Sequence, residues 1–251
     1  MGLAPHEDLY GEARMYDSMF SWDPSTEVQY VIEVARHFRA GDVSRVLDVG
    51  CGTGRVAAGF RGLGYDVLCL DLSYEMCSYA RRTRALEVVV ADAVSIPLRE
   101  ASMDLAYSFL AVLNHLSSLA SLEEHLREVW RVLRGGGVYV ADLVVNTPDC
   151  VGVCDEWETR LEGQPCVVRH AVKEVEGRYF TEVLEIMCVG GTRRRFESRL
   201  HAPGASELVE VGKRVGFDKV VFLKPFKLEV LSEPRGRAFM VLVKPRSSRR
   251  R

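Results

Sequence analysis

The sequence predicts an α/β protein with a seven-stranded, mostly parallel sheet, helices on both faces and an antiparallel β insertion after the fifth strand. Three observations carry this prediction. Short apolar runs alternate with amphipathic helical segments between residues 45 and 145, which is the pattern of βαβ units. The first of these runs ends in three alternating glycines. After residue 147 the pattern changes to long strands joined by Glu-Gly and Gly-Gly turn signals.

The parallel part follows from hydrophobic periodicity and from residues that start and stop helices. Ser73 is a good N-cap for one helix. A second helix places Leu122, Leu126 and Val129 on one face, and the glycines 135–137 are expected to end it. The expected elements are, in chain order, strand 45–50, helix 55–63, strand 65–71, helix 73–84, strands 87–91 and 103–109, helix 119–134 and strand 138–145.

The insertion is expected to occupy residues 147–203. Its strands, 167–175, 178–189 and 192–201, are separated by Glu176-Gly177 and Gly190-Gly191. A helix over 206–215 and strands over 220–223 and 237–243 then complete the main sheet. The expected parts of the chain are an N-terminal segment 1–44, a main domain of 45–146 and 204–245, the insertion, and a basic tail 246–251.

Charge and composition exclude several classes of protein. The chain has 251 residues and a formal net charge of −2, so it has no overall attraction to nucleic acid. Residues 205–251 hold twelve bases and five acids; we expect the terminal arginines to be solvated, with contact to RNA as the alternative. No apolar run approaches the length of a membrane helix, and six acids in the first 30 residues do not fit a signal peptide. We therefore expect a cytosolic protein without a membrane partner.

The seven cysteines do not indicate a metal site. None forms a C-x-x-C pair and no histidine stands at zinc spacing, so we expect no metal. Cys51, Cys69 and Cys77 are expected to be small buried groups. Cys150 and Cys154 are close enough in sequence to pair, but reduced thiols are the expectation in the cytosol.

The segment from Val46 to Gly54 is the most informative in the chain. Its glycines stand where the first strand turns into the first helix, so they let a ligand approach the backbone and the helix amides. The spacing is G-x-G-x-G, whereas a dinucleotide fingerprint is G-x-G-x-x-G. The third glycine of such a fingerprint would stand at position 55, where this chain has Arg55. The loop has no G-K-[ST], which excludes a nucleoside triphosphate P-loop.

The sequence Asp-Val-Gly-Cys-Gly-Thr-Gly over 48–54 resembles motif I of the class I methyltransferases, which use S-adenosylmethionine. Asp71 closes the second strand and Asp92 the third, at intervals similar to those of that family. The resemblance covers residues 10–145 closely and 205–243 loosely. It implies a Rossmann-like fold and S-adenosylmethionine as the cofactor.

The resemblance also implies how the cofactor is held. Asp71 would accept both ribose hydroxyls, Asp92 would accept the adenine amino hydrogens with the Ala93 amide donating to the ring, and Asp48 would organise the ammonium end. Met76 would pack on the adenine, although an apolar helix residue is more often part of the core. The implied cofactor site comprises Tyr10, Arg14, Tyr16, Asp48, Gly50, Cys51, Gly52, Gly54, Asp71, Leu72, Met76, Asp92, Ala93, Phe109 and Leu110.

The N-terminal segment resembles the tyrosine-bearing lid that often precedes the first strand in this family. Tyr10, Arg14 and Tyr16 are the candidates to hold the cofactor carboxylate. An amphipathic helix packed on the sheet is the equally weighted alternative.

Residues after the fourth strand are expected to face the transferred methyl group. Asn114 and His115 resemble the frequent His-His of the family and are the candidate catalytic residues, with a structural or helix-capping histidine as the alternative. No Asn-Pro-Pro or Asp-Pro-Pro run follows strand four, no Pro-Cys lies near it, and no acid ends it. The first absence disfavours methylation of the exocyclic amines of nucleic-acid bases. The second disfavours methylation of cytosine at C5. The third disfavours metal-dependent methylation of catechols.

What remains is methyl transfer to a nitrogen or oxygen of a small molecule, with protein or RNA as the alternative acceptor. A non-catalytic nucleotide-binding module is the alternative from a different class. The insertion would overhang the cleft and shape the acceptor pocket, or it would form the interface of a homodimer.

Overall fold

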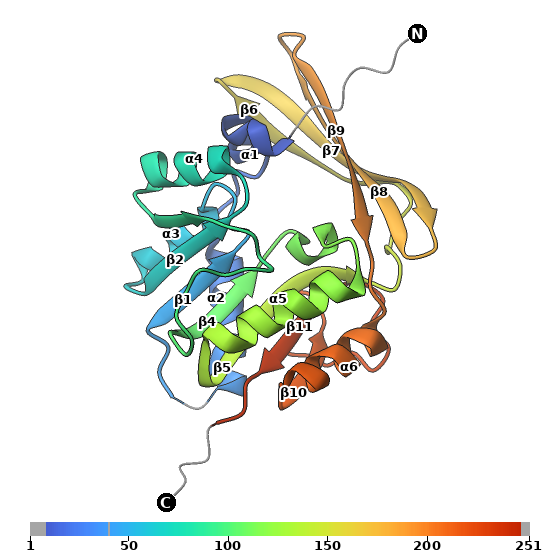
Figure 1. Ribbon diagram of the computed structural model, residues 1–251. Helices are drawn as coiled ribbons and strands as arrows, with labels where there is room; N and C mark the ends of the chain where they lie inside the picture. Colours follow the sequence, from blue (N-terminus) through green and yellow to red (C-terminus); the bar gives the residue numbers. More distant parts are fainter. Residues whose placement is uncertain (1–8, 40, 247–251) are drawn as a thin grey trace, which may run out of the picture.

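The computed structural model describes residues 9–39 and 41–246, and these residues form two β-sheets (Figure 1). The strands of the main sheet are β1 (Arg45–Val49), β2 (Asp66–Asp71), β3 (Glu87–Val90), β4 (Met103–Ser108), β5 (Leu133–Val145), β10 (Lys219–Leu223) and β11 (Gly236–Val243). The second sheet consists of β6 (Gly152–Leu161), β7 (Gln164–Glu176), β8 (Tyr179–Cys188) and β9 (Arg193–His201), and we call it the flap.

The main sheet has the strand order β10-β11-β5-β4-β1-β2-β3. Strands β1 to β5 pair in parallel, whereas β11 runs antiparallel between β5 and β10. The order reverses between β1 and β4, so ligands are expected at the carboxyl ends of these two strands. The expected Rossmann-like sheet with an antiparallel insertion after its fifth strand is confirmed.

Helices cover both faces of the main sheet (Figure 1). On one face, Val31, Phe60 and Ala80 share a core cluster with β1 and β4; on the other, Leu122 and Leu208 share a second cluster with β5. Because both faces are covered, the central strands are mostly apolar, with Asp48 in β1 and Asp104 in β4 as buried exceptions. The helices are η1 (Leu9–Gly11), α1 (Ala13–Met19), α2 (Ser25–Phe38), α3 (Arg55–Gly62), α4 (Tyr74–Arg84), η2 (Val112–His115), α5 (Leu119–Val132) and α6 (Ala205–Val215).

The flap has four strands where the sequence predicted three. The additional strand, β6, lies at the edge of the flap and alternates exposed and half-buried residues, so its apolar signal is weak. Glu162 and Gly163 join it to β7 with φ angles of +52° and +83°. This Glu-Gly pair repeats the Glu176-Gly177 signal and would have located the missing hairpin.

The end of α5 also differs from the expectation. The helix ends at Val132, two residues before the expected position, and Gly135–Gly137 lie inside β5 instead of stopping the helix. A Cβ at Gly137 would lie 2.8 Å from the carbonyl oxygen of Arg134 and 3.2 Å from that of Asp104. Close packing of backbone against backbone therefore explains this glycine, and helix capping does not.

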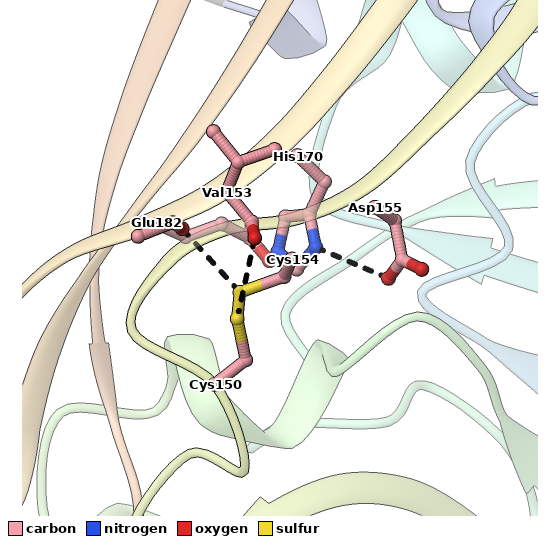
Figure 2. Close-up of a disulfide and its surroundings, with 7 residues drawn as sticks. Cys150, Val153, Cys154, Asp155, His170 and Glu182 are labelled. Atoms are coloured by element: carbon pink, nitrogen blue, oxygen red, sulfur yellow. Dashed lines mark hydrogen bonds and ion pairs between the residues drawn. A yellow bond between two sulfur atoms is a disulfide. The ribbon is translucent and has the colours of Figure 1, made fainter.

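Two disulfides stand where reduced thiols were expected. One joins Cys150 to Cys154 beside Asp155 and His170 (Figure 2). The other joins Cys166 of β7 to Cys188 of β8, which are directly opposite each other in the flap with their Cα atoms 4.0 Å apart. Cys69 and Cys77 are buried free thiols, as expected, and Cys51 is half-buried.

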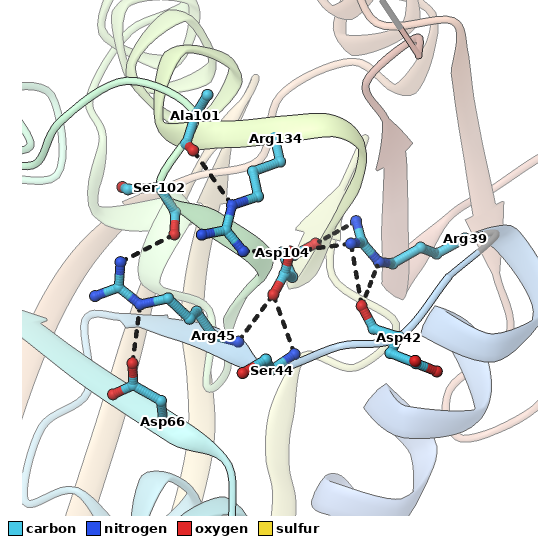
Figure 3. Close-up of polar contacts among 9 residues, drawn as sticks. All are labelled: Arg39, Asp42, Ser44, Arg45, Asp66, Ala101, Ser102, Asp104 and Arg134. Atoms are coloured by element: carbon cyan, nitrogen blue, oxygen red, sulfur yellow. Dashed lines mark hydrogen bonds and ion pairs between the residues drawn. The ribbon is translucent and has the colours of Figure 1, made fainter.

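Asp104 connects the amino-terminal ends of β1 and β4, which lie at the other end of these strands from the glycine-rich loop (Figure 3). Its buried carboxylate accepts hydrogen bonds from the backbone amides of Ser44 and Arg45, both at 3.0 Å, and pairs with Arg39 and Arg134. Burial by itself would raise the pKa of Asp104, but these donors outweigh it and hold the pKa below its usual value. Asp104 therefore ties the start of β1 to β4 and α2.

We expect Asp104→Asn to lower the free energy of unfolding by about 1.5–3 kcal/mol, the contribution of hydrogen bonds to a charged group. Because the folded-state pKa is depressed, this stabilisation is present at neutral pH and is lost as the pH falls below the ordinary carboxyl range. Urea denaturation at pH 7 measures the loss. The control is Asp66→Asn, which breaks an exposed pair with Arg45 at the same edge and should cost under about 1 kcal/mol. Equal losses in the two variants would contradict the role of Asp104.

No helix within residues 9–39 and 41–246 is both long and apolar enough to cross a membrane. Among the same residues, no group of three or more His, Cys, Asp or Glu side chains is placed to hold a metal ion. The homodimer through the flap stays a prediction.

Candidate functional site

The glycine-rich loop joins the carboxyl end of β1 to the start of α3. Gly50, Gly52 and Gly54 have φ angles of +70°, +54° and +79°, a region that favours glycine. A Cβ at Gly50 would lie 2.5 Å from Cγ2 of Val112, and one at Gly52 would meet the Tyr16 ring at 3.4 Å. The loop therefore needs glycine for its backbone conformation and because η2 and α1 pack directly against it.

Asp71, at the end of β2, holds this loop in place. One carboxylate oxygen accepts a hydrogen bond from the Gly52 amide at 2.7 Å, and the other accepts one from the Ser73 amide at 2.9 Å. Burial raises the pKa of Asp71, and these two amides oppose the rise. Each oxygen keeps acceptor capacity for a further donor, such as a ribose hydroxyl.

Asp48 lies at the bottom of a small cavity beside the loop. The Tyr107 hydroxyl donates to its Oδ2 at 2.8 Å, and Oδ1 has no hydrogen-bond partner within the described residues. Burial raises the pKa of Asp48 to about 7. The cavity measures about 30 Å³ and is lined by Tyr16, Phe20, Asp48, Gly50, Cys51, Thr53, Arg55, Val56, Phe109 and Leu110.

A buried carboxylate with one oxygen that lacks a donor suits a cationic group, because a buried charge needs further partners. The ammonium of the methionine end of S-adenosylmethionine is such a group, and the cavity has room for an end of the molecule only. The residues present therefore fit the cofactor that the resemblance implies.

The arginine of this cavity is Arg55, which the sequence analysis noted only as a departure from the dinucleotide fingerprint. Its guanidinium pairs with Glu27 at 2.7 Å and lies over the Trp22 ring. Arg14, the arginine expected to hold the cofactor carboxylate, lies elsewhere: its side chain is 72% exposed and pairs with Glu162 of the flap. The position of Arg55 as the first residue of α3 is the signal that could have identified it.

The raised pKa of Asp48 predicts that cofactor binding depends on pH. In the free protein the Asp48 carboxyl is largely protonated below about pH 7, whereas a bound ammonium favours the carboxylate, so binding releases a proton. The affinity for S-adenosylhomocysteine should weaken as the pH falls from 8 to 6, by up to about tenfold per unit. Calorimetry in buffers of different ionisation enthalpy measures the released proton. In Asp48→Asn the dependence should vanish, and the same pH dependence in both proteins would refute the assignment.

The residues expected around the adenine are in the segments that follow β2 and β3. Asp92 is exposed after β3 and accepts the Val94 amide at 3.1 Å. The Ala93 carbonyl hydrogen-bonds the His125 ring, and Leu72 is 71% exposed. Met76 in α4 is completely buried, which agrees with the alternative expectation that it belongs to the hydrophobic core.

The N-terminal segment lies on the glycine-rich loop as a lid. Asp17 of α1 accepts hydrogen bonds from the Thr53 hydroxyl at 2.7 Å and the Tyr79 hydroxyl at 3.0 Å, and it pairs with Arg84. Sequence reasoning missed Asp17, because nothing local distinguishes it from the other acids of the segment. Tyr16, on the same helix, is half-buried, and desolvation raises its pKa.

Tyr10 and His115 meet beside the loop. The Tyr10 hydroxyl and His115 Nε2 are 2.9 Å apart, and the Ser73 hydroxyl donates to the Tyr10 carbonyl at 2.8 Å. Desolvation lowers the pKa of His115, while the nearby carboxylates of Glu182 and Asp71 act in the opposite direction. His115 is therefore a neutral imidazole near pH 7, close to both the cofactor loop and the flap.

Asn114 has a different environment from its neighbour. It is completely buried, its amide nitrogen donates to the carbonyls of Val144 and His201 at 2.8 and 2.7 Å, and its oxygen accepts the Val144 amide at 2.9 Å. The side chain is used to join η2 to β5 and β9. The geometry gives Asn114 a positioning role for the loop that carries His115.

This arrangement defines a class of protein: a Rossmann-like α/β protein with a glycine-rich loop and carboxylates at the carboxyl ends of its central strands. Residues 47–141 match the family model described as "Methyltransferase domain". The chain is 30% identical over 220 residues to the uncharacterized protein MJ1252 of Methanocaldococcus jannaschii, covering 88% of this chain and 78% of that one. The chain belongs to the class I S-adenosylmethionine-dependent methyltransferases.

Other relatives match over shorter lengths. The malonyl-[acyl-carrier protein] O-methyltransferase of Enterobacter lignolyticus is 44% identical over 96 residues, which are 38% of this chain and 37% of that enzyme. This match is therefore confined to well under half of either protein, and it bears on the shared domain alone.

Solved structures share the whole fold, flap included. The sugar N-methyltransferase KedS8 of Streptoalloteichus has a TM-score of 0.75 at 22% identity and covers 98% of this chain and 96% of its own. Streptomyces venezuelae DesVI has a TM-score of 0.76 at 20% identity, covering 96% of this chain and all of its own. At 22% and 20% identity, these similarities establish the fold alone.

Proposed function

We propose that this enzyme transfers a methyl group from S-adenosylmethionine to a nitrogen or oxygen atom of a small molecule. The observation that carries the proposal is the hydrogen bond of 2.9 Å between Tyr10 and His115 Nε2, next to Asp71 and the glycine-rich loop. A neutral imidazole beside the cofactor site is suited to accept a proton from the methyl acceptor.

The cofactor would be held from three sides. Asp48 receives its ammonium, Asp71 its ribose, and the peptide groups of Gly50 and Gly52 line the methionine end. Arg55 is our candidate for its carboxylate in place of Arg14. The other expected cofactor residues, Asp92 and Ala93 among them, remain proposals on the adenine side.

The cofactor supplies an activated methyl group on a sulfonium, so the protein mainly positions the acceptor and manages a proton. With His115 neutral, the Tyr10 hydroxyl donates to Nε2. Tyr10 can then take a proton from the acceptor as its own proton passes to His115.

The names of the relatives support a small acceptor, either free or carried by a protein. KedS8 is described as a sugar N-methyltransferase, and the Enterobacter lignolyticus enzyme as acting on a malonyl group carried by a protein. The absence of the Pro-Pro motif of base-methylating enzymes from the sequence after β4 points the same way.

A screen of fractionated cell extract with methyl-labelled S-adenosylmethionine tests the proposal. We expect label in the low-molecular-weight fraction, and calorimetry should detect binding of S-adenosylhomocysteine but not of NADH. A preparation of the His115→Ala variant is the control for contaminating activity. Label confined to protein or RNA would overturn the small-molecule acceptor, and binding of NADH without S-adenosylhomocysteine would overturn the cofactor assignment.

A further inference from the structure

The inner face of the flap can be identified from strand register. Residues directly opposite in an antiparallel pair share a face, and every second residue along a strand returns to it. Val168 is opposite Ile186, His170 is opposite Leu184, and Val172 is opposite Glu182. His170 and Glu182 therefore lie on one face, together with the apolar residues on either side of them.

This face is turned toward the rest of the molecule. At one end Val168, Leu184 and Ile186 pack against Met19 and Phe20 of the lid region. At the other end a second apolar cluster contacts the main sheet through Val144; its buried members are Val172, Phe180, Leu200 and Ala202. His170 and Glu182 form a polar island between these two apolar clusters.

The polar island is hydrogen-bonded but keeps acceptor capacity. His170 Nε2 lies 3.0 Å from Glu182 Oε1, and Nδ1 lies 3.7 Å from Asp155 Oδ2. Glu182 raises the pKa of His170, whose ring lies between the carboxylates of Glu182 and Asp155. Within the described residues, Glu182 Oε2 has no hydrogen-bond partner, and the Glu182 side chain is 25% exposed.

Glu182 lies on the strand that begins beside the catalytic candidates. Tyr179, the first residue of β8, donates a hydrogen bond at 2.9 Å to the carbonyl of Ser117, two residues after His115. The negative charge of Glu182 raises the pKa of both His115 and Tyr16, which lie on the cofactor side. Glu182 is therefore a carboxylate on the inward face of the flap, close enough to His115 for their charges to interact.

We propose that Glu182 is a specificity-determining residue that receives the cationic amine of the methyl acceptor opposite His115. This inference rests on the proposed methyl transfer to a small molecule, and it narrows the acceptor to amines. An ammonium group would be drawn to Glu182 Oε2 and would lose its proton toward Tyr10 and His115 before the nitrogen lone pair reacts. A carboxylate acceptor would meet like charges from Glu182 and Asp71.

The test compares Glu182→Gln with the unmodified enzyme and with Glu197→Gln. The glutamine keeps the shape and a hydrogen bond to His170 but removes the charge. Glu197 lies on the opposite face of the flap, paired with Arg195, and serves as the matched control. With the amine acceptor from the screen, we expect KM to rise by about 10- to 100-fold in Glu182→Gln, the effect of losing a charge-assisted hydrogen bond, with kcat within about threefold.

A second measurement needs no turnover. Histidine ring titration by NMR should show lower pKa values for both His115 and His170 in Glu182→Gln, and neither should change in Glu197→Gln. A Glu182 that merely holds the flap together would lower the pKa of His170 alone and leave KM unchanged.

The outcomes separate the two proposals. A screen that labels only protein or RNA would overturn the small-molecule function, whatever the variants show. A small-molecule acceptor that is an alcohol or a carboxylic acid would leave methyl transfer intact and overturn the amine specificity. An unchanged KM for an amine, or an unchanged His115 titration, would overturn the role of Glu182.

Discussion

Replacing His115 with alanine should lower kcat by about 10²- to 10⁴-fold, the usual contribution of a general base. The reason is its position: Nε2 hydrogen-bonds Tyr10 beside the cofactor loop, and burial lowers its pKa so that it can accept a proton at neutral pH. The affinity for S-adenosylhomocysteine should stay within about threefold, because His115 belongs to the acceptor side. Stopped assays with labelled cofactor and the acceptor from the screen give kcat.

The pH profile provides a further check on His115. Because its pKa lies below the ordinary histidine value of 6.5, kcat/KM should rise with pH to a plateau, with the midpoint of the rise below pH 6.5. This rise should be absent in His115→Ala. Tyr10→Phe should show an intermediate loss, since the imidazole remains, and His37→Ala, on the exposed surface of α2, should behave as the unmodified enzyme. An unchanged kcat in His115→Ala would leave the histidine with a structural role.

Asp71→Ala should weaken the binding of S-adenosylhomocysteine by about 10²- to 10⁴-fold. Two charge-assisted hydrogen bonds to the ribose are worth roughly 1.5–3 kcal/mol each. The structure adds a second reason: Asp71 also holds the Gly52 amide and the Ser73 amide, so its loss frees the loop that lies under the cofactor. Calorimetry measures the affinity directly.

Asp92→Ala is the matched comparison for Asp71→Ala. Asp92 is exposed and holds only the nearby Val94 amide, so a contact with the adenine can be replaced in part by water. We expect a loss of about tenfold or less. Thermal unfolding of both variants shows whether a fold defect contributes. A loss for Asp92→Ala that equals or exceeds the loss for Asp71→Ala would refute the ribose assignment.

The parallel core was predictable because its signals are local. Each buried strand is a short apolar run, and βαβ connection rules then order the strands. The edge strand β6 escaped prediction because its residues alternate between exposed and half-buried, which leaves little hydrophobic periodicity. The prediction that the glycines 135–137 end α5 is wrong. Gly137 is explained by its close approach to the backbone of Arg134 and Asp104, a contact that the sequence does not show.

The sequence by itself determined the α/β class, the glycine-rich loop, and the acids Asp48 inside β1 and Asp71 at the end of β2, since each depends on neighbours a few residues away. Only the tertiary structure decided which side chains meet: Tyr10 with His115 across 105 residues, Thr53 with Asp17, and Glu182 with His170 on the inward face of the flap. It also turned Arg14 outward and buried Asn114 among backbone groups. These contacts join the lid, the main sheet and the flap, and packing between distant segments is not encoded in the periodicity of any one of them.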